Sequence, residues 1–220
     1  ETIKTIAEQN GFKMYDCYTG FKWIASVIRE NEGKARYIGG GEESYGFLPE
    51  DFVRDKDSVS SISLMAEIAA WAKDKGMTMY QMLQDIYIKY GYSKEKGISV
   101  VRKGKSGAEE IVAMMKNFRE NPMKELGGSP VILIKDYASL EATDMVNGTK
   151  SKLDMPVTSN VLQYFSADGS KVSIRPSGTE PKIKFYIEVR GIKMDNYADY
   201  DAANAAADAK IEAIKKELGI

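Results

Sequence analysis

The sequence contains no histidine and only one cysteine, Cys17, among its 220 residues. The lack of imidazoles excludes histidine-based metal sites and leaves acid–base chemistry to Lys, Asp, Glu or Tyr. A single thiol excludes an internal disulfide, so a reducing, cytoplasmic setting is expected.

Long apolar runs and an excess of charge of one sign are also absent. No segment approaches the roughly 20 apolar residues that a membrane-spanning helix needs, and no signal peptide is visible. The 31 basic side chains nearly balance the 32 acidic ones. Because nucleic acids and anionic membranes attract strongly basic surfaces, we expect neither as a partner.

The chain begins at Glu1 rather than at a methionine. Ile3 and Ile6 follow at helical spacing, and Asn10 and Gly11 form a stop signal. The chain therefore opens in what reads as the middle of a helix, and we expect a fragment of a longer protein.

The first part of the chain alternates strand and helix patterns. We expect short strands at residues 12–15 and 36–39, and helices at residues 21–30, 58–75 and 78–90. Asp55 or Asp57 is a candidate N-cap for the second helix, and Thr78 with Gln81 fits a capping box for the third. Such alternation predicts a parallel α/β sheet.

The second part has one helix, then several strands, then a final helix. A capping box of Ser106 and Glu109 predicts the start of the first helix. The expected strands cover residues 98–102, 131–134, 160–165, 171–174 and 182–189, and the last helix covers residues 200–218. This order predicts an α+β domain. We place the boundary in the basic stretch between two glycines, giving domains 1–98 and 99–220.

The most informative segment is a loop between two expected strands, Arg175-Pro176-Ser177-Gly178-Thr179-Glu180-Pro181. Gly178 permits close approach of the backbone to a ligand. Two hydroxyls, free amide groups and a guanidinium form a donor-rich loop that suits a phosphate, which arginine can bind with two hydrogen bonds. A surface turn whose hydroxyls satisfy the local backbone is the alternative.

A second candidate loop lies at residues 39–46, just after an expected strand. Glu42 and Ser44 lie between glycines there, and a carboxylate beside a hydroxyl suits the vicinal hydroxyls of a sugar. Lys56 is a candidate acid–base group if a cationic neighbour such as Arg54 lowers its pKa. A glycine-rich turn with solvated acids, a weak metal site and a solvated helix start are the alternatives.

Together these segments resemble the α-D-phosphohexomutase superfamily, in its phosphoglucomutase/phosphomannomutase-like branch. The stretches that carry the resemblance are TGFKWI, GGGEESYGFLPEDFVRDKDSV and DGSKVSIRPSGTEPKIKFYIEV. The resemblance implies that residues 1–98 are most of the third domain, of α/β class. It implies that residues 99–220 are the fourth, an α+β domain with a TATA-binding-protein-like topology.

The resemblance implies an enzyme that interconverts hexose 1-phosphate and hexose 6-phosphate. A phosphoserine donates its phosphoryl group to the free sugar hydroxyl, and the bisphosphate intermediate reorients before the serine takes back the other phosphate. Mg²⁺ and glucose 1,6-bisphosphate, as activator and intermediate, are the implied cofactors. The serine and the metal-binding aspartates belong to the two N-terminal domains, which this chain lacks, so the chain alone is expected to be inactive.

The family's residue roles carry over onto matching positions. The phosphate that is not transferred is expected to bind Arg175, Ser177, Gly178, Thr179 and Lys184. The sugar hydroxyls are expected to bind Glu42 and Ser44, Lys56 is the implied catalytic acid–base residue, and Thr19 and Gly20 form a substrate-contacting loop. The EES sequence with Tyr45 favours glucose phosphates. A mutase for mannose or pentose phosphates and a non-catalytic sugar-phosphate-binding module remain alternatives.

Overall fold

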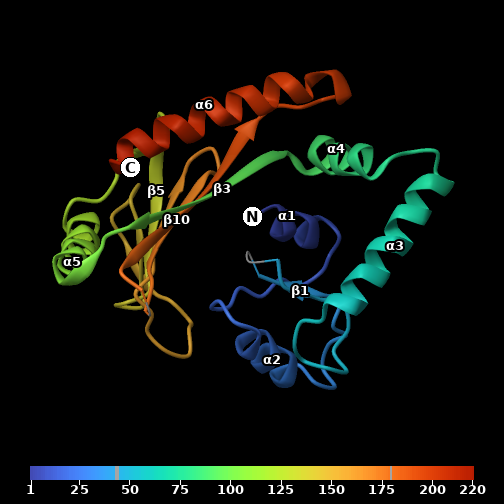
Figure 1. Ribbon diagram of the computed structural model, residues 1–220, viewed down its shortest axis with the longest axis horizontal. Coiled ribbons are helices and arrows are strands. Elements are labelled where there is room, and N and C mark those ends of the chain that lie inside the picture. Colours follow the sequence, from blue (N-terminus) through green and yellow to red (C-terminus); the bar gives the residue numbers. More distant parts are fainter. Residues whose placement is uncertain (43–44, 179) are drawn as a thin grey trace. The chain divides into compact units, whose positions relative to one another are not determined.

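The computed structural model describes residues 1–42, 45–178 and 180–220 (Figure 1). Two residues expected in the binding loops, Ser44 and Thr179, lie outside these ranges. The chain forms two compact units, Glu1–Asp85 and Ile86–Ile220. Each unit is described separately, and the expected domain boundary between residues 98 and 99 stays a prediction.

The first unit is mainly helical. Its helices are α1 (Thr2–Gln9), α2 (Phe21–Glu30), α3 (Ser58–Asp74) and the greater part of α4 (Met79–Tyr90), and a short antiparallel ribbon pairs β1 (Gly40–Gly41) with β2 (Phe47–Leu48). Phe21 and Ile28 of α2 pack with Leu48 in a small core. Tyr37 borders that core and donates a hydrogen bond to the carbonyl oxygen of Leu48 at 2.9 Å. Burial, and then the charge of Asp51, raises the pKa of Tyr37 to about 12.

The parallel sheet expected in this part of the chain is not formed by the described residues. Residues 12–15 and 36–39 form no strand and belong to neither of the described sheets. A strand is defined by hydrogen bonds to a neighbour, and an extended segment without a neighbour leaves its backbone groups to water.

The helix boundaries of the first unit follow their local signals. The carboxylate of Asp57 accepts hydrogen bonds from the amides of Val59 and Ser60, which makes it the N-cap of α3. The expected capping box before α4 is confirmed, because Thr78 and Gln81 exchange hydrogen bonds of 2.8 and 3.1 Å. These bonds satisfy amides that have no partner within the helix.

The second unit is a large antiparallel sheet with two long helices. Its strand order is β3-β10-β9-β8-β5-β6-β7, and β4 pairs with β5. The strands are β3 (Tyr92–Val101), β4 (Glu125–Leu126), β5 (Ser129–Asp136), β6 (Glu141–Asp144), β7 (Lys150–Lys152), β8 (Leu162–Ser166), β9 (Lys171–Pro176) and β10 (Lys182–Ile192). The helices are α5 (Gly104–Glu120), α6 (Tyr200–Leu218) and a 3-10 turn at Tyr197–Asp199. The order of helices and strands confirms the α+β class, whereas the TATA-binding-protein-like topology stays a prediction.

One capping prediction in this unit is wrong. Helix α5 begins at Gly104, with Lys103 as N-cap and no side-chain cap, so it starts ahead of the expected box at Ser106 and Glu109. Gly107 has the tightest surroundings in this first turn, because an added Cβ would lie 2.3 Å from the carbonyl oxygen of Arg102. Close packing of the helix start against the end of β3 therefore outweighs the capping signal.

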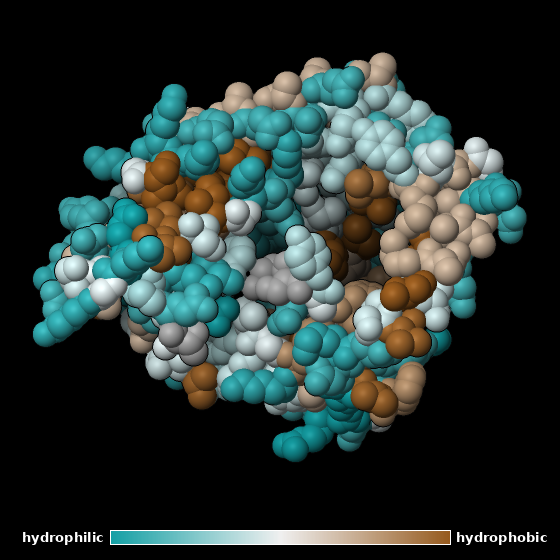
Figure 2. All heavy atoms as spheres, in the orientation of Figure 1, coloured by the Kyte–Doolittle hydropathy of each residue, from teal (hydrophilic) through white to brown (hydrophobic). Residues whose placement is uncertain are grey.

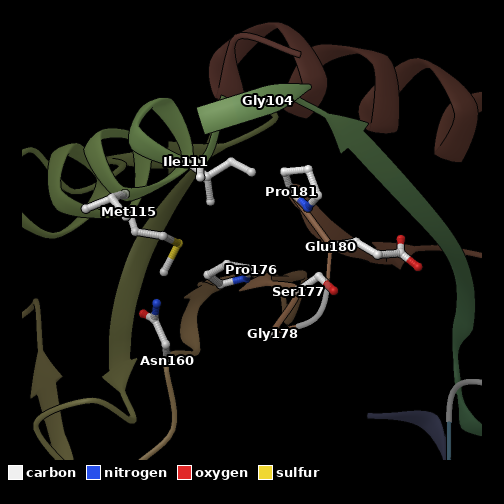
Figure 3. Close-up of a pocket in the computed structure, with 11 residues that line it drawn as sticks. Gly104, Ile111, Met115, Asn160, Pro176, Ser177, Gly178, Glu180 and Pro181 are labelled. Carbon is white, nitrogen blue, oxygen red and sulfur yellow. The ribbon is translucent and has the colours of Figure 1, made fainter. Parts of the chain in front are cut away.

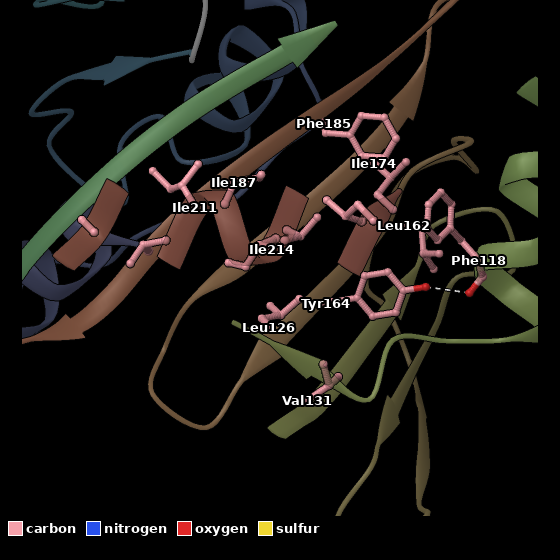
Figure 4. Close-up of a cluster of buried hydrophobic side chains, with 14 of the residues drawn as sticks. Phe118, Leu126, Val131, Leu162, Tyr164, Ile174, Phe185, Ile187, Ile211 and Ile214 are labelled. Carbon is pink, nitrogen blue, oxygen red and sulfur yellow. Dashed lines mark hydrogen bonds between the residues drawn. The ribbon is translucent and has the colours of Figure 1, made fainter. Parts of the chain in front are cut away.

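The core of the second unit lies between the sheet and the two helices (Figure 4). Alternate residues of β8, β9 and β10 are buried on one face, where they meet the apolar faces of α5 and α6. Tyr164 lies at the centre, is fully buried and donates a 2.6 Å hydrogen bond to the carbonyl oxygen of Phe118. Burial raises the pKa of Tyr164. Because side chains alternate along a strand, the opposite face of these strands presents the polar residues.

A polar cluster ties α6 to the turn between β8 and β9. The carboxylate of Asp168 pairs with Lys210 and accepts hydrogen bonds from the Ser166 hydroxyl at 2.7 Å and the Ser170 amide at 3.1 Å. Burial raises the pKa of Asp168, but these hydrogen bonds outweigh it and lower the pKa to about 2.

Hydrophobic side chains also remain on the surface, where the face drawn in Figure 2 shows separate hydrophobic patches among hydrophilic residues. Val59, Ile62 and Met65 of α3 are each at least half exposed. Among the described residues no helix has the length and apolar composition to cross a membrane.

Candidate functional site

The first candidate site surrounds Phe21, at the start of α2. The amide of Gly20 donates a 3.0 Å hydrogen bond to the carboxylate of Glu42, which joins the loop at residues 19–20 to the β1–β2 ribbon. The ammonium group of Lys56 lies 5.3 Å from the centre of the Phe21 ring. The structure thus brings together Gly20, Glu42 and Lys56, which are separated in sequence.

Phe21 holds this arrangement in place, although sequence reasoning gave it no role. Its side chain is 6% exposed, and a Cβ added to Gly46 would lie 2.5 Å from its ring. The glycine that ends the sugar-binding candidate loop is therefore needed for that loop to pack against the ring. The only sequence signal was an aromatic residue followed by the helical pattern of α2.

The surroundings of Lys56 differ from those expected from the sequence. Arg54 pairs with Glu32, and the Lys56 ammonium lies 3.3 Å from a carboxylate oxygen of Asp55. The Lys56 side chain is 55% exposed. Lys56 is therefore positioned near the candidate sugar loop, but the expected cationic neighbour is engaged elsewhere.

The second candidate site is the loop between β9 and β10. Arg175 and Lys184 are direct register partners on these antiparallel strands, so their side chains leave the same face of the sheet side by side. Within residues 1–42, 45–178 and 180–220, neither cationic group has a hydrogen bond or an ion pair to a carboxylate. Two cations placed directly opposite each other repel, so an anion bound between them would relieve that repulsion.

The neighbouring cations on the same face have partners. Lys171 lies opposite Glu188 in register, and their side chains approach to 3.5 Å. Lys182 pairs with Glu180 at 2.6 Å. Of these four cations of β9 and β10, Arg175 and Lys184 are therefore the two without an ion pair to a described carboxylate.

Backbone hydrogen bonds fix the shape of this loop. The amide of Ser177 donates to the carbonyl oxygen of Lys182 at 2.8 Å, and the Lys182 amide donates to the Glu180 carbonyl oxygen at 2.8 Å. The Arg102 amide, at the end of β3, donates to the Pro181 carbonyl oxygen at 2.9 Å. The loop is thus held at both ends before any ligand binds, which lowers the entropic cost of binding.

A pocket of about 560 Å³ lies between this loop and α5 (Figure 3). Its floor is apolar, with Ile111 and Met115 of α5 directed toward Pro176 and Pro181. The polar side chains of its lining are those of Ser177, Glu180 and Asn160. This lining offers few partners for an anion, whereas the loop and the polar face of the sheet carry the cationic side chains.

The magnesium implied by the resemblance finds no matching ligands in the part of the chain that the structure describes. No group of three or more Asp, Glu or Cys side chains lies close enough together there to hold a metal ion. We therefore assign no step of the chemistry on this chain to a metal.

Comparisons with known proteins agree with the sequence motifs. Residues 1–90 match the family model described as phosphoglucomutase/phosphomannomutase, alpha/beta/alpha domain III, and residues 134–207 match the C-terminal domain of the same family. The phosphoglucomutase of Staphylococcus aureus (strain MRSA252) is 37% identical over 198 residues, which is 90% of this chain and 36% of that protein. The phosphoglucomutase of Staphylococcus haemolyticus is 34% identical over 197 residues, with coverage of 90% and 35%.

A solved structure supports the fold. It is the open form of the exocytosis-sensitive phosphoprotein pp63/parafusin, a phosphoglucomutase from Paramecium, which aligns with a TM-score of 0.59 and 20% identity. The alignment covers 99% of this chain and 37% of that one. This chain therefore spans about a third of the length of the relatives it matches.

Proposed function

Because this chain belongs to the phosphoglucomutase/phosphomannomutase family, we propose that it supplies the sugar- and phosphate-binding part of a phosphohexomutase. The observation that carries the proposal is the pair of Arg175 and Lys184, side by side without a described anionic partner. A phosphate monoester is a dianion near neutral pH, and it offsets both charges at once.

The loop after Arg175 provides the remaining donors. The hydroxyl of Ser177 and the backbone near Gly178 lie at the rim of the loop, where they contact the phosphate that is not being transferred. A binding site made of cationic side chains and backbone amides recognises a phosphate group regardless of which sugar carbon carries it. That tolerance is what a mutase needs, because its substrate binds by either end.

The sugar is assigned to the first unit. Glu42 uses one carboxylate oxygen to hold the Gly20 amide, which leaves the other oxygen for a sugar hydroxyl. Thr19, beside Gly20, contacts the substrate, and Lys56 exchanges a proton with a sugar hydroxyl. Ser44 and Thr179 complete the proposed contacts from outside the described ranges.

The proposed reaction interconverts hexose 1-phosphate and hexose 6-phosphate, with glucose as the preferred sugar. A phosphoserine breaks its P–O bond and gives the phosphoryl group to the free sugar hydroxyl, whose proton is lost. The resulting bisphosphate, glucose 1,6-bisphosphate, reorients, and the serine oxygen takes the other phosphoryl group. In this proposal the serine and the magnesium ligands lie in the part of the full-length enzyme that corresponds to the additional length of the relatives. We propose that this full-length enzyme is cytoplasmic.

Calorimetric titration of the 220-residue chain tests the binding role. Inorganic phosphate and glucose 6-phosphate should both bind, and Arg175→Ala should abolish binding of both. Lys193→Gln is a charge-matched control, because Lys193 is an exposed cation outside the loop, and it should bind as the parent chain does. Equal affinity of Arg175→Ala and the parent chain would refute the phosphate site.

Two further measurements test the sugar and the chemistry. Glu42→Gln should weaken binding of glucose 6-phosphate while leaving that of inorganic phosphate unchanged, and the parent chain should prefer glucose 6-phosphate to mannose 6-phosphate. The chain with glucose 1-phosphate, glucose 1,6-bisphosphate and Mg²⁺ should form no glucose 6-phosphate. Turnover by the chain alone would overturn the proposed division of labour.

A further inference from the structure

A third cation, Lys182, lies on the same face of the sheet as the pair at the phosphate loop. Lys182 and Lys184 are two residues apart on β10, so their side chains leave the same side of the strand. The Lys182 ammonium is held 2.6 Å from the carboxylate of Glu180, and its side chain is 25% exposed. Glu180 is itself a member of the loop.

The electrostatic influence of Glu180 extends beyond its partner. The hydrogen bond from Lys182 and then its charge lower the pKa of Glu180, and the charge of Lys184 adds to the decrease. One carboxylate thus acts on two of the three cations at the loop end of β9 and β10. A nearby cation at the end of β3, Arg102, is paired separately with Glu110 at 3.1 Å.

The charges at this end of the sheet match one phosphate dianion. Neither Arg175 nor Lys184 forms an ion pair with a described carboxylate, whereas Lys182 and Glu180 form one with each other. If Glu180 were neutral, three cations would face a ligand with two negative charges. A mutase must release the phosphate so that the other end of the intermediate can bind, and an excess of positive charge opposes that release.

We propose that Glu180 is a positioning residue that holds Lys182 back from the ligand and so limits the affinity of the loop for phosphate. This proposal rests on the phosphate-binding function proposed above. Neutralising Glu180 should tighten binding, although the residue lies inside the binding loop. Neutralising Lys182 should weaken binding, because Glu180 then faces the incoming dianion without compensation.

A four-protein comparison tests the proposal. Binding of inorganic phosphate to the 220-residue chain is measured by calorimetry at pH 8 and low salt, for the parent, Glu180→Gln, Lys182→Gln and the double variant. The expected dissociation constants fall about 3- to 10-fold for Glu180→Gln and rise by a similar factor for Lys182→Gln, as one unit charge at this range predicts. The double variant should return close to the parent value.

A purely structural role of the ion pair gives a different pattern. If the pair only shaped the loop, both single variants would bind more weakly, and that result would overturn the proposal. The salt dependence is a second measurement, because the affinity of Glu180→Gln should fall more steeply with added salt than that of the parent. An unchanged slope would likewise count against it. If the parent binds phosphate but Glu180→Gln does not bind it more tightly, only this inference is refuted. If none of the four proteins binds phosphate, the proposed phosphate site is refuted as well.

Discussion

Removing Lys184 should make the ligand-free chain more stable while it destroys the phosphate site. Lys184 and Arg175 are register partners, and the Cβ atoms of opposite residues on paired strands lie roughly 5 Å apart, so we take a charge separation of roughly 6 Å. Two unit charges at that distance repel by about 0.7 kcal/mol in water. We therefore expect Lys184→Gln to raise the free energy of unfolding by about 0.5 kcal/mol at roughly 0.01 M salt, where screening is weak.

The assay is urea unfolding followed by circular dichroism, because urea carries no charge and leaves the ionic strength fixed. The parent, Lys184→Gln, Arg175→Gln and the double variant form a cycle that isolates the repulsion from changes in packing. Because either substitution removes the same repulsion, the double variant should gain less than the sum of the two singles. The coupling should fade at about 1 M salt, where the screening length is near 3 Å.

Phosphate should reverse the order of stability. At a hundred times its dissociation constant, phosphate stabilises the parent by about 2.7 kcal/mol and leaves both single variants nearly unchanged. If both single variants were less stable than the parent and the coupling were zero at low salt, the two cations would not be opposed as described. The argument for an anion site on this face would then fail.

Three other predictions concern the rest of the chain. Tyr164→Phe should lower the free energy of unfolding by about 1 to 2 kcal/mol in circular dichroism, because the buried carbonyl oxygen of Phe118 loses its donor; a change below a few tenths would contradict this. Gly46→Ala should destabilise the first unit by about 1 to 3 kcal/mol, because the new methyl group would overlap the Phe21 ring, and tryptophan fluorescence reports on that unit; an unchanged midpoint would argue against that packing. Asp168→Asn should cost about 1 to 2 kcal/mol at pH 7, after allowance for solvent screening, and the cost should vanish as the pH falls from about 4 to 2. The sign follows because the folded-state pKa is lowered, and a cost that stays constant over this range would disprove the assignment.

The sequence predicted helices better than strands, and the reason is physical. Helices α2 and α6 were expected at the residues where they lie, because their signals are local: an apolar stripe, and Gly219 in the left-handed region past the end of α6. Strands β6 and β7 were missed, since their polar residues pair through the backbone at a sheet edge. The described residues of the first unit form no parallel sheet for the same reason, because the presence of a partner strand is not a local property of the sequence.

The two candidate sites differ in how much of their geometry could be predicted from the sequence. Alternation along β10 placed Lys184 on a polar face, and the loop chemistry placed Arg175 nearby, but only the register showed them opposite each other. The contacts of Phe21 with the glycine loop and with Lys56 depend on tertiary packing, and no sequence pattern indicated them. The ion pair of Lys182 with Glu180 could not be predicted from the loop sequence alone, because it depends on the backbone hydrogen bond between these two residues that closes the loop.

Two pairs of opposite residues on one face of the sheet differ in the charges that they bring together. Lys171 and Glu188 are register partners, and the carboxylate of Glu188, whose side chain is only 5% exposed, is compensated by the ammonium opposite. Four residues along β9, Arg175 meets a second cation at the equivalent position and is left uncompensated by the described residues. Because opposite charges on facing positions of paired strands attract, a carboxylate in place of Lys184 would be expected to stabilise the ligand-free sheet. Under the proposed function, the repulsion at the second pair keeps a site open for a dianion. The proposed role of Glu180 is to cancel the third positive charge next to that site.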